Sequence, residues 1–306
     1  RIPGLDRWAT SIDISQRFTA PAPVVYLTTG LNYPDALSAG PAAAHLGGLV
    51  MLVQPQGASA DVLSRIAALQ PQRVIVLGAA NSVSDLAFAQ IDATVFSAVG
   101  VHAERLTGAD RYGTSRAIAR DAFLVNDTDP GGSTVAYISN GNNFPDALSA
   151  GGAAATVDAP VILVNGLAST VPDETLALLD DLGVTQVIVT GAANSVSDGI
   201  FAQLDARYPD VIRQTGADRF GTSAVVNNFR FSPPETTALL ATGLNYPDAL
   251  AGSALAGKVG APLYITQQGC IMPNIYAELV RLKVTQVWLL GNTPSLSADV
   301  ASFVRC

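Results

Sequence analysis

The sequence predicts an α/β protein made of three tandem copies of one α/β/α unit, each with a parallel sheet. Long strings recur at a spacing of about a hundred residues, and short apolar runs alternate with segments of helical spacing inside each copy. The chain has 306 residues, of which 49% are hydrophobic and only 14% are charged. Such a composition supports a large core and excludes an intrinsically disordered chain.

Two strings define the repeat. The first reads RIPGLDRWATS at 1–11, RLTGADRYGTS at 105–115 and RQTGADRFGTS at 213–223. The second reads GLNYPDAL at 30–37, GNNFPDAL at 141–148 and GLNYPDAL at 243–250. The period is longer than that of solenoid repeats, so each copy can bury its own core. We therefore predict three domains that pack directly on one another, at 1–103, 104–212 and 213–306.

Strands and helices alternate inside each copy. In the first copy, apolar β-rich runs predict strands at 24–29, 49–53 and 73–77. Helical spacing predicts helices at 6–18, 34–46, 59–69 and 84–91. The strands of the other copies are predicted at 134–139, 160–164, 186–190, 237–242, 262–266 and 286–290. Nearly continuous apolar strands indicate helices on both faces of each parallel sheet, which makes the units Rossmann-like or Toprim-like. A polar insertion is predicted at 126–133.

Charge and hydropathy exclude two classes of partner. The net charge of −8 argues against nucleic acid, whose phosphates require many Lys and Arg side chains. No apolar run reaches the length of a transmembrane helix, so we expect no membrane insertion. The first residues lack the pattern of a signal peptide, and Arg1 already lies inside the first repeated string. We therefore expect the chain to derive from a longer precursor.

The PDAL string follows a strand at the carboxyl edge of its sheet, where open α/β sheets bind ligands. Its amide, aromatic ring and carboxylate suit a carbohydrate. The candidate residues are Asn32, Tyr33, Pro34, Asp35, Asn143, Phe144, Pro145, Asp146, Asn245, Tyr246, Pro247 and Asp248. Structural roles are equally open, because the aspartate could accept backbone N–H bonds in the first helical turn and the ring could staple the helix entry.

Two arginines six residues apart begin every copy: Arg1 and Arg7, Arg105 and Arg111, Arg213 and Arg219. A guanidinium group binds phosphate or carboxylate through two parallel hydrogen bonds, so these arginines are candidates for an anion site. The alternative is an ion pair with an aspartate of a neighbouring unit: Asp6, Asp110 or Asp218.

The turn after the third strand is predicted to be structural. It reads GAANSVSD at 78–85 and at 191–198, so that Ser82 and Ser195 stand three residues before Asp85 and Asp198. This spacing predicts a helix cap with reciprocal side-chain to backbone bonds. Ala298 replaces the aspartate in the third copy, which predicts a weaker or displaced cap there.

No motif for catalysis or metal binding is present in the sequence. It lacks GxGxxG, a P-loop, GxSxG and any His or Cys cluster with metal spacing, so we expect no cofactor and no metal. His45 and His102 do not occupy equivalent positions in the copies. Residues repeated three times favour several weak binding sites, which gain avidity together, over one active site.

The GADRYGTS string, the GNNFPDALSAG turn, the PVILV strand and the VIVTGAANSVS turn together resemble the type 2 cell-wall-binding repeat of Gram-positive surface proteins. The resemblance covers essentially the whole chain. It implies three units around a pseudo-threefold axis that anchor a surface protein non-covalently to an anionic secondary cell-wall polymer. It also transfers polymer binding to the PDAL positions, to the preceding asparagines, and to Arg7, Arg111 and Arg219. One departure is the usual second glycine of the third-strand turn, which is Ala79, Ala192 and Asn292 here.

These observations predict an extracellular, carbohydrate-binding module of the cell wall that is not an enzyme. The expected partners are a teichoic-acid-like or other secondary glycan and a fused or associated surface domain outside this chain. The acidic composition suits a neutral or pyruvylated glycan, or arabinogalactan, better than teichoic acid. Cys270 and Cys306 are either buried thiols or a disulfide that pins the C-terminus, and the resemblance favours the disulfide. A protein–protein scaffold for a surface lattice and an envelope hydrolase are the alternative functions.

Overall fold

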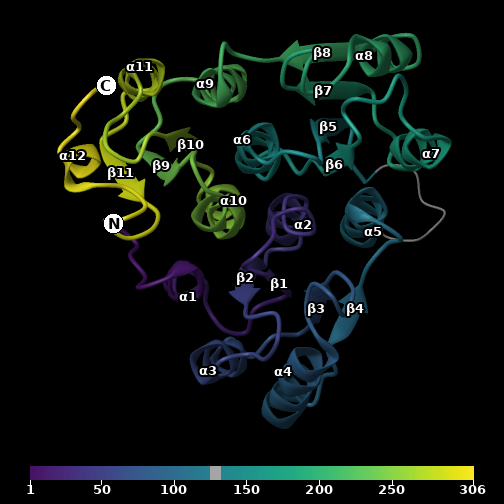
Figure 1. Ribbon diagram of the computed structural model, residues 1–306, viewed down its shortest axis with the longest axis vertical. Coiled ribbons are helices and arrows are strands. Elements are labelled where there is room, and N and C mark those ends of the chain that lie inside the picture. The colour runs from purple at the N-terminus through teal and green to yellow at the C-terminus, as the bar shows by residue number, and fades with distance from the viewer. Residues whose placement is uncertain (125–131) are drawn as a thin grey trace.

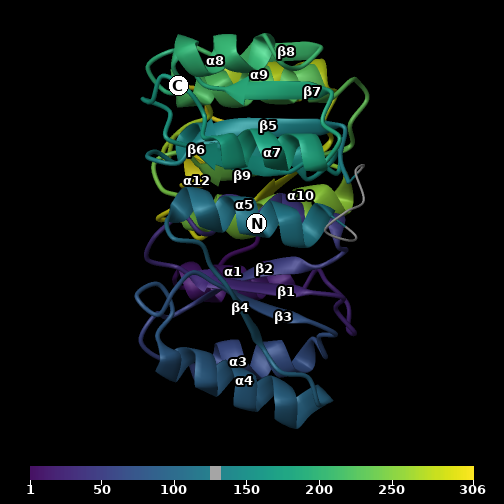
Figure 2. The ribbon, with the colours of Figure 1, turned by 90° about the vertical axis from the view of Figure 1, so that its right-hand side faces the viewer.

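The computed structural model describes residues 1–124 and 132–306. Three α/β units surround a common axis and form a triangle in Figure 1. Figure 2 shows that the strands and helices of the units run side by side across the molecule. The predicted fold class is confirmed, whereas most of the predicted insertion at 126–133 lies outside the described residues. No helix among the described residues is both long and apolar enough to cross a membrane.

The first unit contains a four-stranded parallel sheet in the order β2-β1-β3-β4. Its elements are α1 (Arg7–Ser15), β1 (Val25–Thr29), α2 (Ala39–His45), β2 (Leu49–Val53), α3 (Ala60–Ala68), β3 (Val74–Leu77), α4 (Asp85–Val99) and β4 (Glu104–Leu106). Strands β1 to β3 lie where the sequence predicts them. Helix α2 begins later than predicted and α4 ends later. Strand β4 was not predicted, because its three residues form no apolar run.

The second unit repeats this sheet in the order β6-β5-β7-β8. Its elements are α5 (Arg111–Phe123), β5 (Val135–Asn140), α6 (Pro145–Ala154), β6 (Val161–Val164), α7 (Asp173–Asp181), β7 (Gln186–Thr190), α8 (Asp198–Asp205) and β8 (Asp210–Gln214). Every residue of β6 is buried, as expected for a strand with helices on both faces of its sheet.

The third unit has three named strands in the order β10-β9-β11. Its elements are α9 (Arg219–Arg230), β9 (Thr237–Thr242), α10 (Pro247–Val259), β10 (Leu263–Thr266), α11 (Pro273–Arg281), β11 (Gln286–Leu289) and α12 (Ala298–Ala301). The place of a fourth strand is taken by Ile2, which forms a parallel bridge with Leu290. The Ile2 N–H donates to the Leu289 carbonyl at 2.8 Å, and the Gly291 N–H donates to the Ile2 carbonyl at 3.0 Å. The first residues of the chain therefore join the third unit to the first and close the circle of three units.

The sequence repeat is offset from the sheets. Strand β4 opens the second predicted domain, yet it pairs with β3 of the first sheet. Strand β8 spans the predicted boundary at residue 212 and belongs to the second sheet. The strings at 105–111 and 213–219 thus begin inside the last strand of one sheet and lead into the first helix of the next unit.

Helices α2, α6 and α10 contact one another at the centre of the triangle (Figure 1). Their small side chains permit a close approach. A Cβ atom on Gly40 would lie 1.7 Å from the Ser253 hydroxyl, and one on Gly257 would lie 2.5 Å from the Ala44 Cβ. Interiors of such density leave no room for a larger residue. Packing therefore explains the small residues that follow PDAL in the repeat.

Cys270 and Cys306 form a disulfide, with their Cα atoms 5.2 Å apart. Beside it, Ile271 and Arg305 form a parallel bridge. The bond confirms the predicted disulfide and holds the last residues of the chain against the start of α11. In units one and two the corresponding segments continue into β4 and β8 instead.

Candidate functional site

Three pockets related by the pseudo-threefold axis open at the carboxyl edges of the sheets. Each lies between the PDAL turn and third-strand turn of one unit and the first residues of the following repeat. We name them junction pockets A, B and C, after the junctions of units one and two, two and three, and three and one. Their volumes are about 200, 270 and 130 Å³, respectively.

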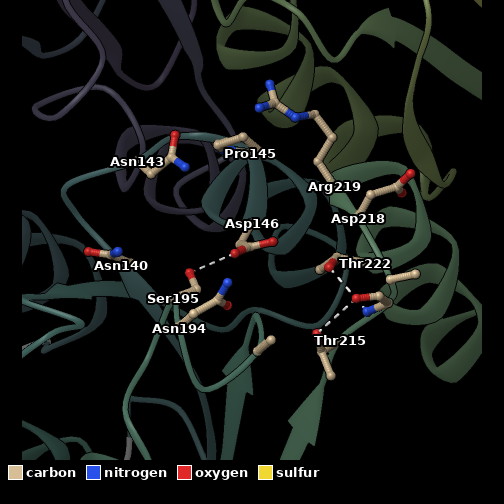
Figure 3. Close-up of a pocket in the computed structure, with 13 residues that line it drawn as sticks. Asn140, Asn143, Pro145, Asp146, Asn194, Ser195, Thr215, Asp218, Arg219 and Thr222 are labelled. Atoms are coloured by element: carbon tan, nitrogen blue, oxygen red, sulfur yellow. Dashed lines mark hydrogen bonds between the residues drawn. The ribbon is translucent and has the colours of Figure 1, made fainter.

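The pockets bring together most of the residues predicted to bind a polymer. Pocket A is lined by Asn32, Pro34, Asp35 and Arg111; pocket B by Asn143, Pro145, Asp146 and Arg219; pocket C by Asn245, Pro247, Asp248 and Arg7. In Figure 3, Asp146, Asn194, Ser195 and Thr222 gather around pocket B, while the Arg219 guanidinium extends past Pro145. Residues far apart in the sequence thus form three similar polar cavities.

The three predicted aromatic residues lie elsewhere, in one cluster on the axis that we name the axial triad. The ring centroid of Tyr33 is 5.5 Å from those of both Phe144 and Tyr246, and the latter two are 5.7 Å apart. All three contacts are edge-to-face, which is a favourable geometry for aromatic pairs. The rings are half-buried and hold the starts of α2, α6 and α10 together. Each ring packs against the other two units.

The aspartates of the PDAL strings accept hydrogen bonds from serines of the third-strand turn. The Ser82 hydroxyl donates to Asp35 at 2.8 Å, and the Ser195 hydroxyl donates to Asp146 at 2.7 Å (Figure 3). Asp146 lies in the first turn of α6, as the structural alternative expects, but its carboxylate accepts from the Ser195 hydroxyl, and the N-cap residue Phe144 makes no side-chain cap. The carboxylate points across the pocket because a serine donor lies on the neighbouring strand turn.

The third-strand turn is capped by a different serine from the predicted one. Ser84 accepts a bond from the Ala87 N–H, and Ser197 accepts one from the Ile200 N–H. The predicted caps by Ser82 and Ser195 are therefore wrong, since those hydroxyls are bonded to aspartates. Residue 84 has the extended backbone that precedes a helix, which places its side chain over the first turn.

A glycine is required where this turn begins. Gly78 has φ +86, and a Cβ atom on it would lie 2.4 Å from an Asp35 carboxylate oxygen. Gly191 is equivalent, with φ +102. Left-handed backbone and the close approach of the aspartate both exclude a side chain. The following residue has no positive φ, so the departure from a second glycine leaves the backbone of the turn unstrained.

The two arginines of each repeat have different roles. Arg105 donates at 2.9 Å to both the Gly78 and Val83 carbonyls and forms an ion pair with Asp85 at 3.3 Å. Arg213 makes the equivalent contacts, and Arg1 donates to the Gly291 and Ser297 carbonyls. The first arginine of each pair therefore clamps the third-strand turn of the preceding unit.

The second arginines surround the axial triad. Arg7, Arg111 and Arg219 donate to the carbonyls of Gly30, Gly141 and Gly243 at 2.5, 2.8 and 2.8 Å. The Arg7 and Arg219 guanidinium carbons lie 6.0 and 5.6 Å from the centroids of Tyr246 and Phe144. Their side chains are half-buried, so part of each cation faces solvent. Three positive charges thus ring the axis.

In the part of the chain that the structure describes, no ion pair joins these arginines to Asp6, Asp110 or Asp218. Asp6, Asp110 and Asp218 cap helices instead, accepting bonds from the backbone N–H groups of Ala9, Gly113 and Gly221. The capping aspartates also line the pockets. Each pocket therefore holds two carboxylates and one guanidinium group, a combination that suits hydroxyl donors.

Further pocket residues were assigned no ligand role from the sequence. They include Asn81 and Asn194 in the third-strand turns and the loops at 107–109 and 215–217. The only sequence signal for a ligand role was that these residues recur in two copies. Such recurrence is equally typical of turns with a structural role. Pocket C differs, because Leu5, Asn292 and Pro294 replace the residues Ala, Ala and Asn of the other two. It is also the smallest of the three.

Every repeat matches the family Cell wall binding domain 2 (CWB2), at residues 1–87, 105–201 and 213–301. The chain belongs to this family. It is therefore a cell-wall-binding module, and the resemblance deduced from the repeated strings is confirmed.

Curated relatives of the CWB2 module occur in Bacillus subtilis (strain 168). The chain is 25% identical over 306 residues to N-acetylmuramoyl-L-alanine amidase LytC, and 25% identical over 303 residues to an amidase enhancer. These alignments cover 100% and 98% of the chain. The chain spans only 58% and 39% of the lengths of these two relatives.

Solved structures share the architecture of the CWB2 module. Cwp6 from Clostridium difficile matches with a TM-score of 0.85 and 26% identity, over 95% of this chain and 45% of that one. Cwp8 from Clostridium difficile matches with a TM-score of 0.83 and 23% identity, over 98% of this chain and 49% of that one. The arrangement of three units is thus shared with both.

Asp248 in pocket C gives a prediction about pH. Burial raises the pKa of this carboxyl, whereas Ser295, Thr10 and Arg7 lower it by smaller amounts. The folded protein therefore favours the neutral form of the Asp248 carboxyl. The stability that this neutral carboxyl contributes is lost as the pH rises above about 4, the ordinary pKa of an aspartate. We expect Asp248→Asn to lose less stability than the wild type between pH 4 and pH 7, measured by thermal melts across that range. Asp35→Asn, at the half-buried equivalent position, is the control. Parallel pH profiles for Asp248→Asn and the wild type would contradict the prediction.

Proposed function

We propose that this CWB2 module attaches a surface or secreted protein to the cell wall by holding a repeating glycan in its junction pockets. The observation that carries the proposal is the threefold recurrence of one polar pocket around one axis. The PDAL turns meet in the axial triad, so the three pockets open at the same end of the molecule. A long polymer with identical units can occupy several such sites together and gain avidity.

The pocket chemistry suggests the kind of polymer. Asp35 and Asp110 in pocket A accept hydrogen bonds, which favours sugar hydroxyls over phosphates. The arginines around the axial triad offer the positive charge that an acidic substituent requires. Together with the net charge of −8, this arrangement favours a glycan of mostly neutral sugars with spaced acidic groups over a uniform polyanion.

A binding role without catalysis fits the same residues. The PDAL aspartates of pockets A and B accept hydrogen bonds from serines, and neither histidine lines a junction pocket. No group of His, Cys, Asp and Glu side chains within residues 1–124 and 132–306 has the arrangement of a metal site. We infer that any catalytic activity resides in a fused or associated domain. The disulfide agrees with an extracellular location at the cell surface.

A surface-lattice scaffold is the second candidate function. Leu5, Leu31 and Leu244 are 95%, 56% and 52% exposed, and each lies beside a strand end or junction pocket. Exposed leucines at one end of the molecule could contact another protein. Assembly of the purified chain on a sizing column without cell walls would support this function, and a monomer at all concentrations would argue against it.

The anchoring proposal predicts that filling pockets A and B weakens wall binding. Ala109 and Ala217 line these pockets from exposed loops, so Ala109→Trp with Ala217→Trp adds bulk without removing a contact. We expect the apparent affinity for walls of the source organism to fall at least ~10-fold in a pelleting assay. The melting temperature should stay unchanged. Ala89→Trp, on the exposed face of α4, is the matched control. Wild-type pelleting by the double variant would refute the pocket assignment.

A further inference from the structure

The second unit contains an apolar pocket that is separate from the junction pockets. Its floor is the sheet face formed by Tyr137, Ile188 and Ile212 on β5, β7 and β8, and its wall includes Phe229 and Arg230 of α9. We name it the β8 pocket. Its volume is about 220 Å³, room for roughly seven water molecules at ~30 Å³ each. It shares no lining residue with junction pocket B.

The first unit fills the equivalent space with a carboxylate. Tyr26 and Tyr137 both stand four residues before the glycine that ends their strands. The Tyr26 hydroxyl donates to Asp121 of α5 at 3.0 Å. Arg73 donates two hydrogen bonds to the same carboxylate, at 2.7 and 3.0 Å, and two more to Glu104. The tyrosine hydroxyl and the charges are therefore satisfied within the protein.

The second unit has lost this internal carboxylate. Counting from the repeated strings, Phe229 replaces Asp121, Gln186 replaces Arg73 and Ile212 replaces Glu104. The Phe229 side chain lines the pocket but is 68% exposed, so it leaves the space open. Tyr137 remains 2% exposed, and within residues 1–124 and 132–306 no carboxylate accepts from it as Asp121 accepts from Tyr26. The β8 pocket is thus the space left by a missing acidic side chain.

Two further polar groups face the β8 pocket. Gln214 is 2% exposed, and its side-chain oxygen has no hydrogen-bond partner among the described residues. Its amide can rotate to present its NH₂ group instead. Arg230 donates at 2.8 and 2.7 Å to the hydroxyl and carbonyl oxygens of Thr156, which fixes its cation at the rim. Burial raises the pKa of Tyr137 to about 12, while the nearby Arg230 acts to lower it.

We propose that the β8 pocket binds a small carboxylate with a flat apolar body, whose acid group takes the place that Asp121 occupies in the first unit. The Tyr137 hydroxyl, the Gln214 amide and Arg230 are the donors for the acid group. The apolar body lies against Ile188, Ile212 and Val157. Because the β8 pocket and the junction pockets share no residues, this site is independent of wall binding.

Benzoate is the probe that tests the proposal. In ¹H–¹⁵N NMR spectra of the intact chain, titration to ~10 mM benzoate is expected to shift the signals of Gln214 and Arg230, with a Kd of about 1 mM or lower. Benzyl alcohol has a similar body without the charge, and we expect it to bind at least ~10-fold more weakly. No shift at these residues, shifts confined to the junction pockets, or equal binding of benzyl alcohol would overturn the proposal.

A substitution that copies the first unit separates the β8 pocket from other surfaces. Phe229→Asp restores the missing carboxylate on α9 at an exposed position, so the fold is retained. We expect it to weaken benzoate binding at least ~10-fold, because the side chain competes for the donors and repels the ligand. Phe96→Asp, at another exposed phenylalanine on α4, is the matched control and should bind as the wild type does. Unchanged affinity of Phe229→Asp would refute the site.

Discussion

A variant with alanine at all three positions of the axial triad, Tyr33, Phe144 and Tyr246, is expected to melt more than about 10 °C below the wild type. Each ring contacts the two others across unit boundaries, at centroid distances of 5.5 to 5.7 Å. Removing one half-buried ring costs about 2–3 kcal/mol of unfolding free energy, and aromatic pairs add their own contribution. The triple variant loses all three ring contacts at the axis, and these contacts join the units to one another.

Calorimetry tests this prediction, with wall pelleting as the second measurement. The single variant Phe144→Ala should already melt lower, whereas Phe96→Ala, at an exposed ring on α4, should melt as the wild type does. If the triad served only as a sugar platform, the triple variant would keep its melting temperature and lose wall binding. That result would contradict the packing role described above.

Breaking the contact between Ile2 and the third sheet is expected to have the second large effect. Ile2 is 4% exposed and completes the third sheet through two backbone hydrogen bonds. Ile2→Asp places an unpaired carboxylate in this apolar position, so we expect the free energy of unfolding to fall by about 4 kcal/mol. Thermal and denaturant unfolding both measure this change.

A neighbouring substitution controls for added charge. Leu5 is 95% exposed, so Leu5→Asp adds the same charge without burying it and should unfold as the wild type does. Hydrogen exchange of the β11 amides adds a local reading, because these amides should exchange faster in Ile2→Asp alone. Equal stability of Ile2→Asp and the wild type would show that the arrangement of the three units does not depend on the pairing of Ile2 with the third sheet.

The roles of the site residues could be predicted only in part. The sequence located the PDAL positions, and the structure brings Asn, Pro and Asp of each string to a junction pocket. It could not show that Ser82 bonds Asp35 or that Tyr33 contacts Phe144, because these partners are separated by 47 and 111 residues. Local capping was the nearest physical explanation for such residues. It was wrong for Ser82 and Ser195, because their hydroxyls donate to the PDAL aspartates while Ser84 and Ser197 cap the helices.

The sequence by itself determined the threefold repeat, the buried strands and the family, while the disulfide was only favoured by the resemblance. Continuous apolar runs and repeated strings are local signals. They can be recognised from the order of the residues, without knowing which distant segments pair. Only the tertiary structure decided that β4 and β8 belong to the preceding sheets, that Ile2 closes the ring, and that the three rings meet on the axis. These features depend on pairing between distant segments. The local sequence of a short polar strand or a half-buried aromatic residue does not indicate which distant segment it contacts.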